Sequence, residues 1–237
     1  RACPVIHPIR LRLSTAYLVC SERPVLVDAG SPGEAKRILR AVKKRGVEPR
    51  DVALIVATHG HADHVGAAAE LQRLTGAPIA AHRGDLPMIR AGRMSNLVPV
   101  RPRHRILLPL VDRRFESFEI DVPLSEGASL GKWGLPAQVL ETPGHSPGSI
   151  TLVTADGDAF AGDVLIGGFL GGLVQPSRPR LPYFAEDLPQ LYDSIDRVLA
   201  ATNGRLFVGH GGPLDHPAVT RWRETLPLTA AIGAPAT

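Results

Sequence analysis

The sequence contains few cysteines, few lysines and no long apolar run. Its only cysteines, Cys3 and Cys20, are too few for a disulfide-stabilised scaffold, and we expect free thiols in a cytoplasmic protein. Arg, Asp, Gly and Pro interrupt every apolar stretch before it reaches the length that crosses a membrane, so we expect no membrane contact. The N-terminal residues also lack the uninterrupted apolar segment of a signal peptide.

Because lysine is scarce, most of the 27 basic residues are arginine, and the formal net charge is +4. Two arginine-rich stretches lie at 101–105 and 113–114. A basic patch attracts nucleic acid, anionic lipid or an acidic substrate. The alternative is a solvated loop, which we favour, because acidic residues dilute the patch and no aromatic side chains alternate with it. We therefore expect a small-molecule substrate and no nucleic acid.

The pattern of short apolar runs and amphipathic segments predicts an α+β protein in which residues 1–237 form a single domain. Two halves, roughly 5–110 and 120–230, each contain strands and then helices, and two packed sheets with helices outside accommodate this order. A glycine-rich turn is expected at 167–172. We expect strands at 16–20, 24–29, 51–57, 78–82, 137–141, 149–153, 158–161 and 205–208, and helices at 34–45, 65–74, 84–91, 187–201 and from about 217.

Residues 92–123 form the least regular stretch, rich in Arg and Pro. Long irregular segments inside a compact domain are often lids or binding loops, so this one is the main candidate for substrate contacts. The alternative, held equally, is a disordered or merely solvated insertion. Its apolar part, Ile106–Val111, is interpreted either as a homodimer contact or as a strand of the fold.

The densest group of polar side chains is Thr58-His-Gly-His-Ala-Asp-His64, between an expected strand and an expected helix. His59, His61, Asp63 and His64 are the residue types that bind zinc and similar divalent metals. A single histidine on a loop is usually ordinary. Four such side chains within six residues have no packing explanation, so the cluster predicts a metal site.

His145, Asp163 and His210 share a second pattern, because each follows a glycine at the end of an expected strand. Strand-end loops at one rim of a sheet are where sites are usually built. A glycine at such a turn permits an unusual backbone conformation and leaves room nearby. Together with the cluster, these residues give five histidines and two aspartates, enough for two metal shells.

These seven residues, in this order, resemble the metallo-β-lactamase superfamily, as do Asp28 in Val-Leu-Val-Asp-Ala-Gly and the segment Thr142–Gly148. The resemblance extends over about residues 13–215. It implies a four-layer αβ/βα sandwich with two divalent metal ions, zinc first and iron or manganese as alternatives, at one edge between the sheets. By the same resemblance, His59, His61 and His145 hold one ion, and Asp63, His64 and His210 hold the other. Asp163 bridges them, and Asp28 orients a ligand imidazole.

The implied activity is hydrolysis of an ester-type carbonyl, in a thioester or a lactone, by a metal-bridging hydroxide. Asp63 or Asp163 would accept the proton and return it to the leaving group. Zinc β-lactamases usually have Cys where this chain has Asp163, so we do not expect an antibiotic hydrolase. Lactonases of the family often carry a Tyr shortly after the bridging Asp; here Tyr183, from another loop, is the candidate substrate contact.

Three alternatives remain. A persulfide dioxygenase of the same family would hold a single iron with a subset of the ligands such as His59, His145 and Asp163. An RNA-processing nuclease would fit the basic charge, but no RNA-binding arm or inserted domain is evident. A binding protein without catalysis usually loses ligands, whereas all seven are present here.

Overall fold

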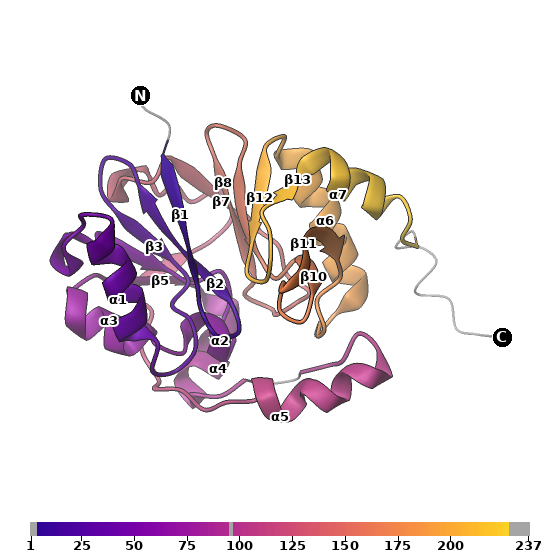
Figure 1. The fold of residues 1–237 in the computed structure, drawn as a ribbon, viewed down its shortest axis with the longest axis horizontal. Helices are drawn as coiled ribbons and strands as arrows, with labels where there is room; N and C mark the ends of the chain where they lie inside the picture. Colours follow the sequence, from indigo (N-terminus) through magenta and orange to yellow (C-terminus); the bar gives the residue numbers. More distant parts are fainter. Residues whose placement is uncertain (1–3, 95–96, 228–237) are drawn as a thin grey trace.

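Two β-sheets pack face to face, and helices cover the outer face of each sheet (Figure 1). This computed structural model describes residues 4–94 and 97–227. The predicted four-layer αβ/βα sandwich is confirmed. Cys3 lies outside the described residues, whereas Cys20 is a free thiol. Among the described residues, no helix has both the length and the apolar content needed to cross a bilayer. That residues 1–237 form one domain stays a prediction.

The first sheet has six strands in sequence order, and its first member was not predicted. Adjacent strands are antiparallel from β1 to β3 and parallel from β3 to β6. The parallel strands β3 and β4 are buried on both faces, which explains their continuous apolar sequence. The strands are β1 (Val5–Arg10), β2 (Thr15–Cys20), β3 (Val25–Val27), β4 (Leu54–Val56), β5 (Ile79–His82) and β6 (Val122–Leu124).

The second sheet has the order β13-β12-β9-β8-β7, and only β12 and β9 are parallel within it. A separate hairpin, β10–β11, occupies the region where we expected a glycine-rich turn at 167–172. That expectation is confirmed at the tip of the hairpin, where Gly171 and Gly172 lie in the turn, but not at Gly167 and Gly168, which belong to β10. Its glycines permit close backbone approach: a Cβ on Gly167 would lie 1.9 Å from the carbonyl oxygen of Pro176. The strands are β7 (Ala137–Glu141), β8 (Ile150–Thr154), β9 (Ala159–Gly162), β10 (Ile166–Phe169), β11 (Val174–Arg180), β12 (Arg205–Val208) and β13 (Leu214–Asp215).

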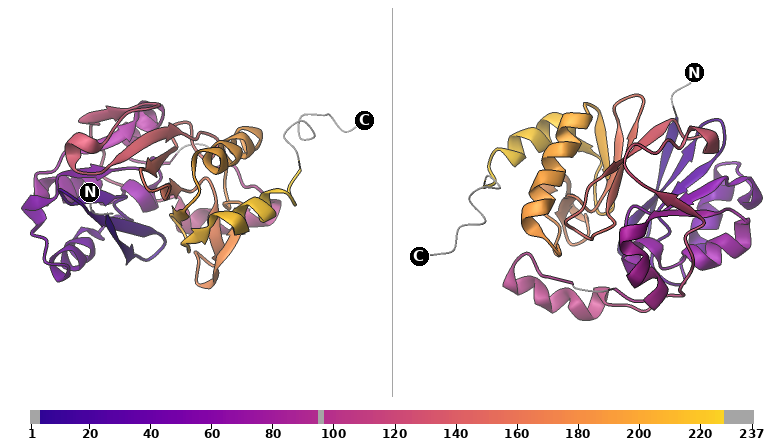
Figure 2. Two further views of the ribbon diagram at one scale, coloured as in Figure 1. Left: turned by 90° about the horizontal axis from the view of Figure 1, so that it is seen from above. Right: turned by 180° about the vertical axis from the view of Figure 1, so that it is seen from behind.

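The helices divide between the two outer layers, as the views from above and behind show (Figure 2). Those of the first half cover the first sheet, and α6 and α7 cover the second. The predicted helices agree in position, although the helix expected at 65–74 is split into two. The helices are α1 (Ala35–Lys44), α2 (Ala62–Val65), α3 (Ala68–Thr75), α4 (Leu86–Ala91), α6 (Leu188–Ala201) and α7 (His216–Arg223).

The core between the sheets follows from the two-residue period of the strands. On β3, Val25 and Val27 face the second sheet, whereas Leu26 faces the helices. Tyr17 of the first sheet packs edge-on against Phe160 and Phe207 of the second, with ring centroids 5.4 and 5.6 Å away. Its hydroxyl also donates a hydrogen bond to the carbonyl oxygen of Val208 (2.6 Å), which joins the two sheets.

The segment 92–123 is more regular than we expected. It contains 3₁₀ turns at Pro102–Leu107 and the helix α5 (Leu108–Val111). Of the two alternatives for Ile106–Val111, the strand was therefore wrong, and the homodimer contact stays a prediction. The prolines at 102 and 109 occupy the first turns of these helical pieces, where a missing N–H costs nothing. Residues 97–111, here called the arm, run along the lower edge of the molecule (Figure 1). β6 pairs with β5, so residues 122–124 belong to the first sheet and not to the second half.

Candidate metal centre

A strand of the first sheet and the short helix that follows it position the His-rich cluster. The parallel strand β4 ends at Val56, and the chain turns into α2 at His61, which is the helix N-cap. His59 and His61 therefore lie on the turn, and Asp63 and His64 lie on the helix. All four are buried, and His64 has no exposed surface. This local strand-to-helix turn explains how four polar side chains from six residues converge.

Asp28 orients the imidazole of His64 by contacting its Nδ1, on the side of the ring away from the other candidate ligands. Its carboxylate Oδ2 lies 2.8 Å from His64 Nδ1, and its Oδ1 accepts hydrogen bonds from the Thr58 N–H (2.8 Å) and hydroxyl (3.0 Å). The Asp28 backbone has φ of 64°, a conformation uncommon outside glycine and one that aspartate tolerates better than most residues. Because an ionised carboxylate only accepts, His64 Nδ1 carries the hydrogen and Nε2 points into the site.

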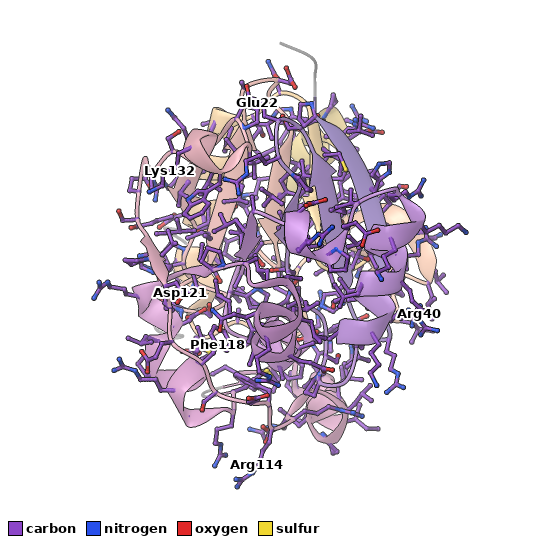
Figure 3. The ribbon with its side chains drawn as sticks, turned by 90° about the vertical axis from the view of Figure 1, so that its left-hand side faces the viewer. Glu22, Arg40, Arg114, Phe118, Asp121 and Lys132 are labelled. Atoms are coloured by element: carbon purple, nitrogen blue, oxygen red, sulfur yellow. The ribbon has the colours of Figure 1, made fainter. Side chains whose placement is uncertain are left out.

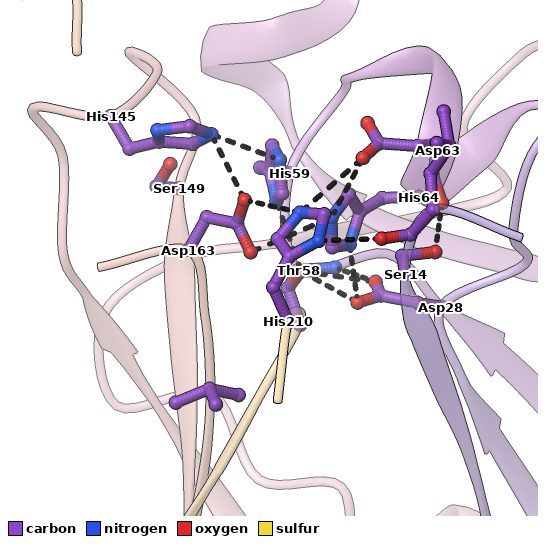
Figure 4. A network of polar contacts seen from close by, with 12 residues as sticks. Ser14, Asp28, Thr58, His59, Asp63, His64, His145, Ser149, Asp163 and His210 are labelled. Carbon is purple, nitrogen blue, oxygen red and sulfur yellow. Dashed lines mark hydrogen bonds and ion pairs between the residues drawn. The ribbon is translucent and has the colours of Figure 1, made fainter. Parts of the chain in front are cut away.

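The second half contributes three side chains from strand-end loops. His145 follows β7, Asp163 follows β9 and His210 follows β12. His145 Nδ1 donates to the carbonyl oxygen of Phe184 (2.8 Å), and His210 Nδ1 donates to that of Leu13 (2.6 Å). Each of these rings is thus oriented by a backbone carbonyl and directs its Nε2 toward the cluster (Figure 4).

Polar contacts join six of the seven predicted side chains in one network (Figure 4), and the seventh, His61, completes it by packing edge-on against His145 with ring centroids 4.5 Å apart. His59 Nε2 and His145 Nε2 are 3.2 Å apart, and His210 Nε2 lies 3.0 Å from Asp163 Oδ2 and 3.3 Å from Asp63 Oδ2. Two ligands on one tetrahedral zinc, each at about 2.0–2.1 Å, would be roughly 3.3 Å apart. Three groups have potential ligand atoms within 4.8 Å of one another: His59–His61–His145, His59–His64–Asp163 and Asp63–His64–His210.

Several atoms in this network are buried without a hydrogen-bond partner. They are His61 Nε2, His64 Nε2 and Asp163 Oδ1. A buried polar atom that makes no hydrogen bond costs about 1–3 kcal/mol, so three of them together need an explanation. Imidazole nitrogen and carboxylate oxygen are ligands of divalent cations, and the residues fit such an ion.

The family profile described as the metallo-beta-lactamase superfamily matches residues 9–210. The chain belongs to the metallo-β-lactamase superfamily. It is 28% identical to the probable metallo-hydrolase YflN of Bacillus subtilis, over 88% of this chain and 84% of that protein. It is 30% identical to the hydroxyacylglutathione hydrolase GloC of Haemophilus influenzae, over 78% and 79% of the two chains. The crystal structure of TTHA1623 in a di-iron-bound form is also 30% identical, with a TM-score of 0.63 over 93% of this chain and 98% of that one.

In this metallo-β-lactamase fold, one set of imidazoles is kept neutral. Burial lowers the pKa of His59 well below its ordinary value, and the neighbouring imidazoles of His64 and His145 lower it further. Burial likewise lowers the pKa of His61 to about 3 and lowers that of His145. These rings therefore present lone pairs at neutral pH, as metal ligands must.

The other two imidazoles lie among carboxylates. Burial lowers the pKa of His64, but the charges of Asp163, Asp28 and Asp63 outweigh it and raise the pKa to about 9. The pKa of His210 is raised well above its ordinary value by Asp163 and Asp63, again against burial. Burial raises the pKa of both Asp63 and Asp163, yet His64 and His210 lower it below the ordinary range. At neutral pH, without bound metal, both imidazoles are therefore positively charged, with a proton on each ring nitrogen. A bound cation would replace one of these two protons.

Glycines beside the ligands allow this close approach, as their sequence positions predicted. Gly144 has φ of 123°, and a Cβ there would lie 2.4 Å from the backbone nitrogen of Leu191. A Cβ on Gly209 would lie 2.2 Å from Asp163 Oδ1 and 2.4 Å from His64 Cε1. A side chain at Gly209 would therefore displace the groups of the candidate site.

One buried carboxylate, Asp85, was missed by the sequence analysis. It is 1% exposed and accepts hydrogen bonds from the Gly60 N–H (2.6 Å), the Gly148 N–H (2.7 Å) and the Ser146 hydroxyl (2.7 Å). Gly60 lies between two candidate ligands of the first half, and Ser146 follows His145 of the second. Asp85 thus joins the two ligand loops. The sequence did contain a signal for Asp85, because it lies in a turn directly after β5. The same position after a strand identified His145, Asp163 and His210.

Tyr183 lies between the arm and the hairpin β10–β11. Its hydroxyl accepts a hydrogen bond from the Leu170 N–H (3.0 Å), and its carbonyl oxygen accepts from the Val100 N–H (2.9 Å) and His104 Nδ1 (2.9 Å). The following residue, Phe184, supplies the carbonyl that orients His145. The structure therefore gives Tyr183 a role in holding the arm next to the site, and a contact with substrate stays a prediction.

Proposed function

We propose that this protein is a dinuclear metal hydrolase that cleaves an ester-type carbonyl, in a thioester or a lactone. The observation that carries the proposal is the position of one carboxylate oxygen. Asp163 Oδ2 lies 3.0 Å from His210 Nε2 and 3.7 Å from His145 Nε2. It therefore lies between the two groups of imidazoles, where a carboxylate that bridges two ions has to be.

In this proposal the ligands divide as the family resemblance implies. His59, His61 and His145 hold one ion, and Asp63, His64 and His210 hold the other, with Asp163 shared. All of these except His210 are buried. Zinc suits the nitrogen-rich shell, and iron or manganese are the alternatives. The di-iron-bound form of the relative TTHA1623 supports testing iron beside zinc.

The chemistry divides between the metals and the protein. Two divalent ions bound here would lower the pKa of a shared water and polarise the substrate carbonyl. In the metal-free protein, His64 and His210 hold the pKa of Asp63 and Asp163 below the usual range. Bound cations would take over this role and keep both carboxylates ionised. Either carboxylate can accept a proton from the attacking water and return it to the leaving group. Asp28 keeps the His64 imidazole oriented throughout.

We also propose that the substrate is a small molecule and that this protein is cytoplasmic. Two rivals are distinguished by experiment. A persulfide dioxygenase would use one iron on a set such as His59, His145 and Asp163, yet the further group Asp63–His64–His210 supports a second ion. An RNA nuclease would need a surface that binds single strands.

The test is hydrolysis of a panel of thioesters, lactones and simple esters by the metal-loaded protein. Asp163→Asn keeps the shape of the side chain and removes its charge, so we expect hydrolysis to fall by roughly 10²–10⁴-fold while the fold is kept. Asp215→Asn, at an exposed carboxylate on β13, is the control. Near-normal hydrolysis by Asp163→Asn would exclude the bridging role.

A further inference from the structure

The surface beside the candidate metal centre combines apolar and basic side chains. Of the eight large hydrophobic side chains that are exposed among the described residues, six belong to the arm or to the hairpin β10–β11. Ile106 of the arm and Leu173 of the hairpin are each 83% exposed. The arm faces the end of this hairpin (Figure 1). The six are Val98, Ile106, Leu110, Leu170, Leu173 and Val174.

Four arginines from the same two elements form what we call the basic cluster: Arg101 and Arg103 of the arm, and Arg178 and Arg180 of β11. The carbonyl oxygen of Tyr183, three residues after Arg180, accepts hydrogen bonds from the Val100 N–H and from His104 Nδ1, so the arm runs past the end of β11 at Arg101 and Arg103. Burial lowers the pKa of Arg180, Tyr183 raises it, and the charges of the other three arginines lower it further. Within residues 4–94 and 97–227, none of the four forms a salt bridge with a carboxylate. Uncompensated like charges repel, which favours a binding site for an anion.

Arg180 is held in a fixed position within the basic cluster. Its guanidinium carbon lies 3.6 Å from the centroid of the Phe169 ring, on the neighbouring strand. A stacked guanidinium keeps its N–H donors free at the edge of the plane. Arg180 is also half-buried, so an anion bound there is screened less by salt than one on open surface.

The backbone connects the basic cluster to the candidate metal ligands. Arg180 pairs across the hairpin with Ile166, three residues after Asp163. The next residue, Gly167, donates its N–H to the carbonyl oxygen of His210 (2.7 Å). On the arm side, Pro99 pairs with Phe184, whose carbonyl orients His145. A molecule bound on the basic cluster therefore lies beside the proposed reaction centre.

We propose that the basic cluster binds a phosphate group on the alcohol or thiol part of the substrate, and that the exposed apolar side chains contact its acyl part. The substrate would then be an apolar acyl group joined by an ester or thioester bond to a phosphorylated carrier. This inference rests on the proposed hydrolase function and specifies its substrate class. Guanidinium groups bind phosphate through paired N–H donors, which suits a cluster of arginines to this ligand.

A small phosphorylated molecule fits better than a nucleic acid strand. Proteins that bind single strands offer aromatic faces on which bases stack. In this cluster Arg180 covers the Phe169 ring, and His104 packs edge-on against the Tyr183 ring with centroids 5.1 Å apart. Each ring therefore already has a packing partner in the protein. These contacts favour a small molecule over RNA, and the test below includes an RNA strand to check this choice.

The test compares two thioesters with the same octanoyl group on the metal-loaded protein. One carries the phosphorylated thiol coenzyme A, and the other carries the neutral thiol N-acetylcysteamine. We expect kcat/KM to favour the phosphorylated carrier at least tenfold at low salt. The exposed pair Arg101→Gln with Arg103→Gln, and separately Arg180→Gln, should remove most of this preference. Arg40→Gln, on α1 and pointing to solvent on the outer helical layer (Figure 3), is the control that should keep it.

Binding of adenosine 3′,5′-bisphosphate, measured by calorimetry, tests the same cluster without any reaction. We expect the double variant to raise its Kd at least tenfold, which is about 1.4 kcal/mol. Hydrolysis of both thioesters at equal kcat/KM would overturn this inference and leave the proposed function standing. Absence of hydrolysis with bisphosphate binding intact would contradict the proposed function and keep the phosphate site. Tighter binding of a single-stranded RNA dodecamer through the same arginines would overturn the small-molecule assignment.

Discussion

Replacing Asp85 should loosen both ligand loops at once. Its carboxylate accepts hydrogen bonds from two buried backbone N–H groups, of Gly60 and Gly148, and from the Ser146 hydroxyl, at 2.6–2.7 Å. Asp85→Ala leaves both N–H groups without this acceptor. Each costs about 1–3 kcal/mol, so the free energy of unfolding should fall by roughly 2–6 kcal/mol. That is a large part of the total for a typical protein, roughly 5–15 kcal/mol.

Graded variants separate this role from general destabilisation. Ser146→Ala removes the hydroxyl that donates to Asp85 and also contacts the Ser149 hydroxyl (2.9 Å), but it keeps both backbone N–H donors on Asp85, so it should cost about 0.5–1.5 kcal/mol. Asp85→Asn keeps one acceptor oxygen but turns an NH₂ group toward a donor, so its cost should lie between the other two. Since Gly60 separates His59 from His61, metal affinity at the His59–His61–His145 group should fall roughly 10–100-fold in Asp85→Ala, as for other residues that orient ligands.

The assays are urea unfolding of the metal-free protein, followed by circular dichroism, and metal titration against a chromophoric chelator. We expect the loss of stability to be largest for Asp85→Ala, smaller for Asp85→Asn and smallest for Ser146→Ala. The loss of metal affinity should follow the same order. An Asp85→Ala protein that loses less than about 1 kcal/mol and binds metal normally would refute this reasoning.

Three further predictions concern the same centre. Asp28→Ala frees the His64 imidazole, so affinity for one ion should fall about 10–100-fold, and an unchanged chelator competition would contradict this. The pKa of His64 is raised to about 9 and that of His210 is raised too, so a metal ion must displace a proton from each imidazole. The apparent metal affinity should therefore rise with pH between 7 and 9. A metal affinity that does not change over this range would argue against protonated ligands. Gly209→Ala places a Cβ 2.2 Å from Asp163 Oδ1, so metal content should drop, and full metal content would show that the loop can move.

The candidate ligands could be predicted because their signal is local. His59, His61, Asp63 and His64 lie within six consecutive positions, and this density is visible without any knowledge of the tertiary structure. The later ligands were recognisable because each follows a glycine where an apolar run ends, and strand ends gather at one rim of a sheet. The order of apolar runs and amphipathic segments was compatible with paired sheets and outer helices, and the family resemblance implied the four-layer sandwich.

The missed features depend on distant partners or on misleading composition. The hairpin β10–β11 is rich in glycine and proline, which is typical of a turn, yet Ile166 pairs with Arg180 across it. β6 pairs with β5 through Ala80 and Val122, a separation that no local pattern reveals. Asp85 likewise acts through Gly148, which is 63 residues away. Composition also concealed the helical turns of the arm, because its prolines lie at helix starts.

The central claim is a pair of metal ions held by seven side chains, and elemental analysis of the protein purified without chelator tests it most directly. The account predicts about two divalent ions per chain, with a clear loss in Asp163→Asn, because that carboxylate lies between both groups. A content of one iron per chain that does not change when Asp63 or His210 is replaced would contradict the dinuclear account. Oxygen uptake with a persulfide would then be the next assay.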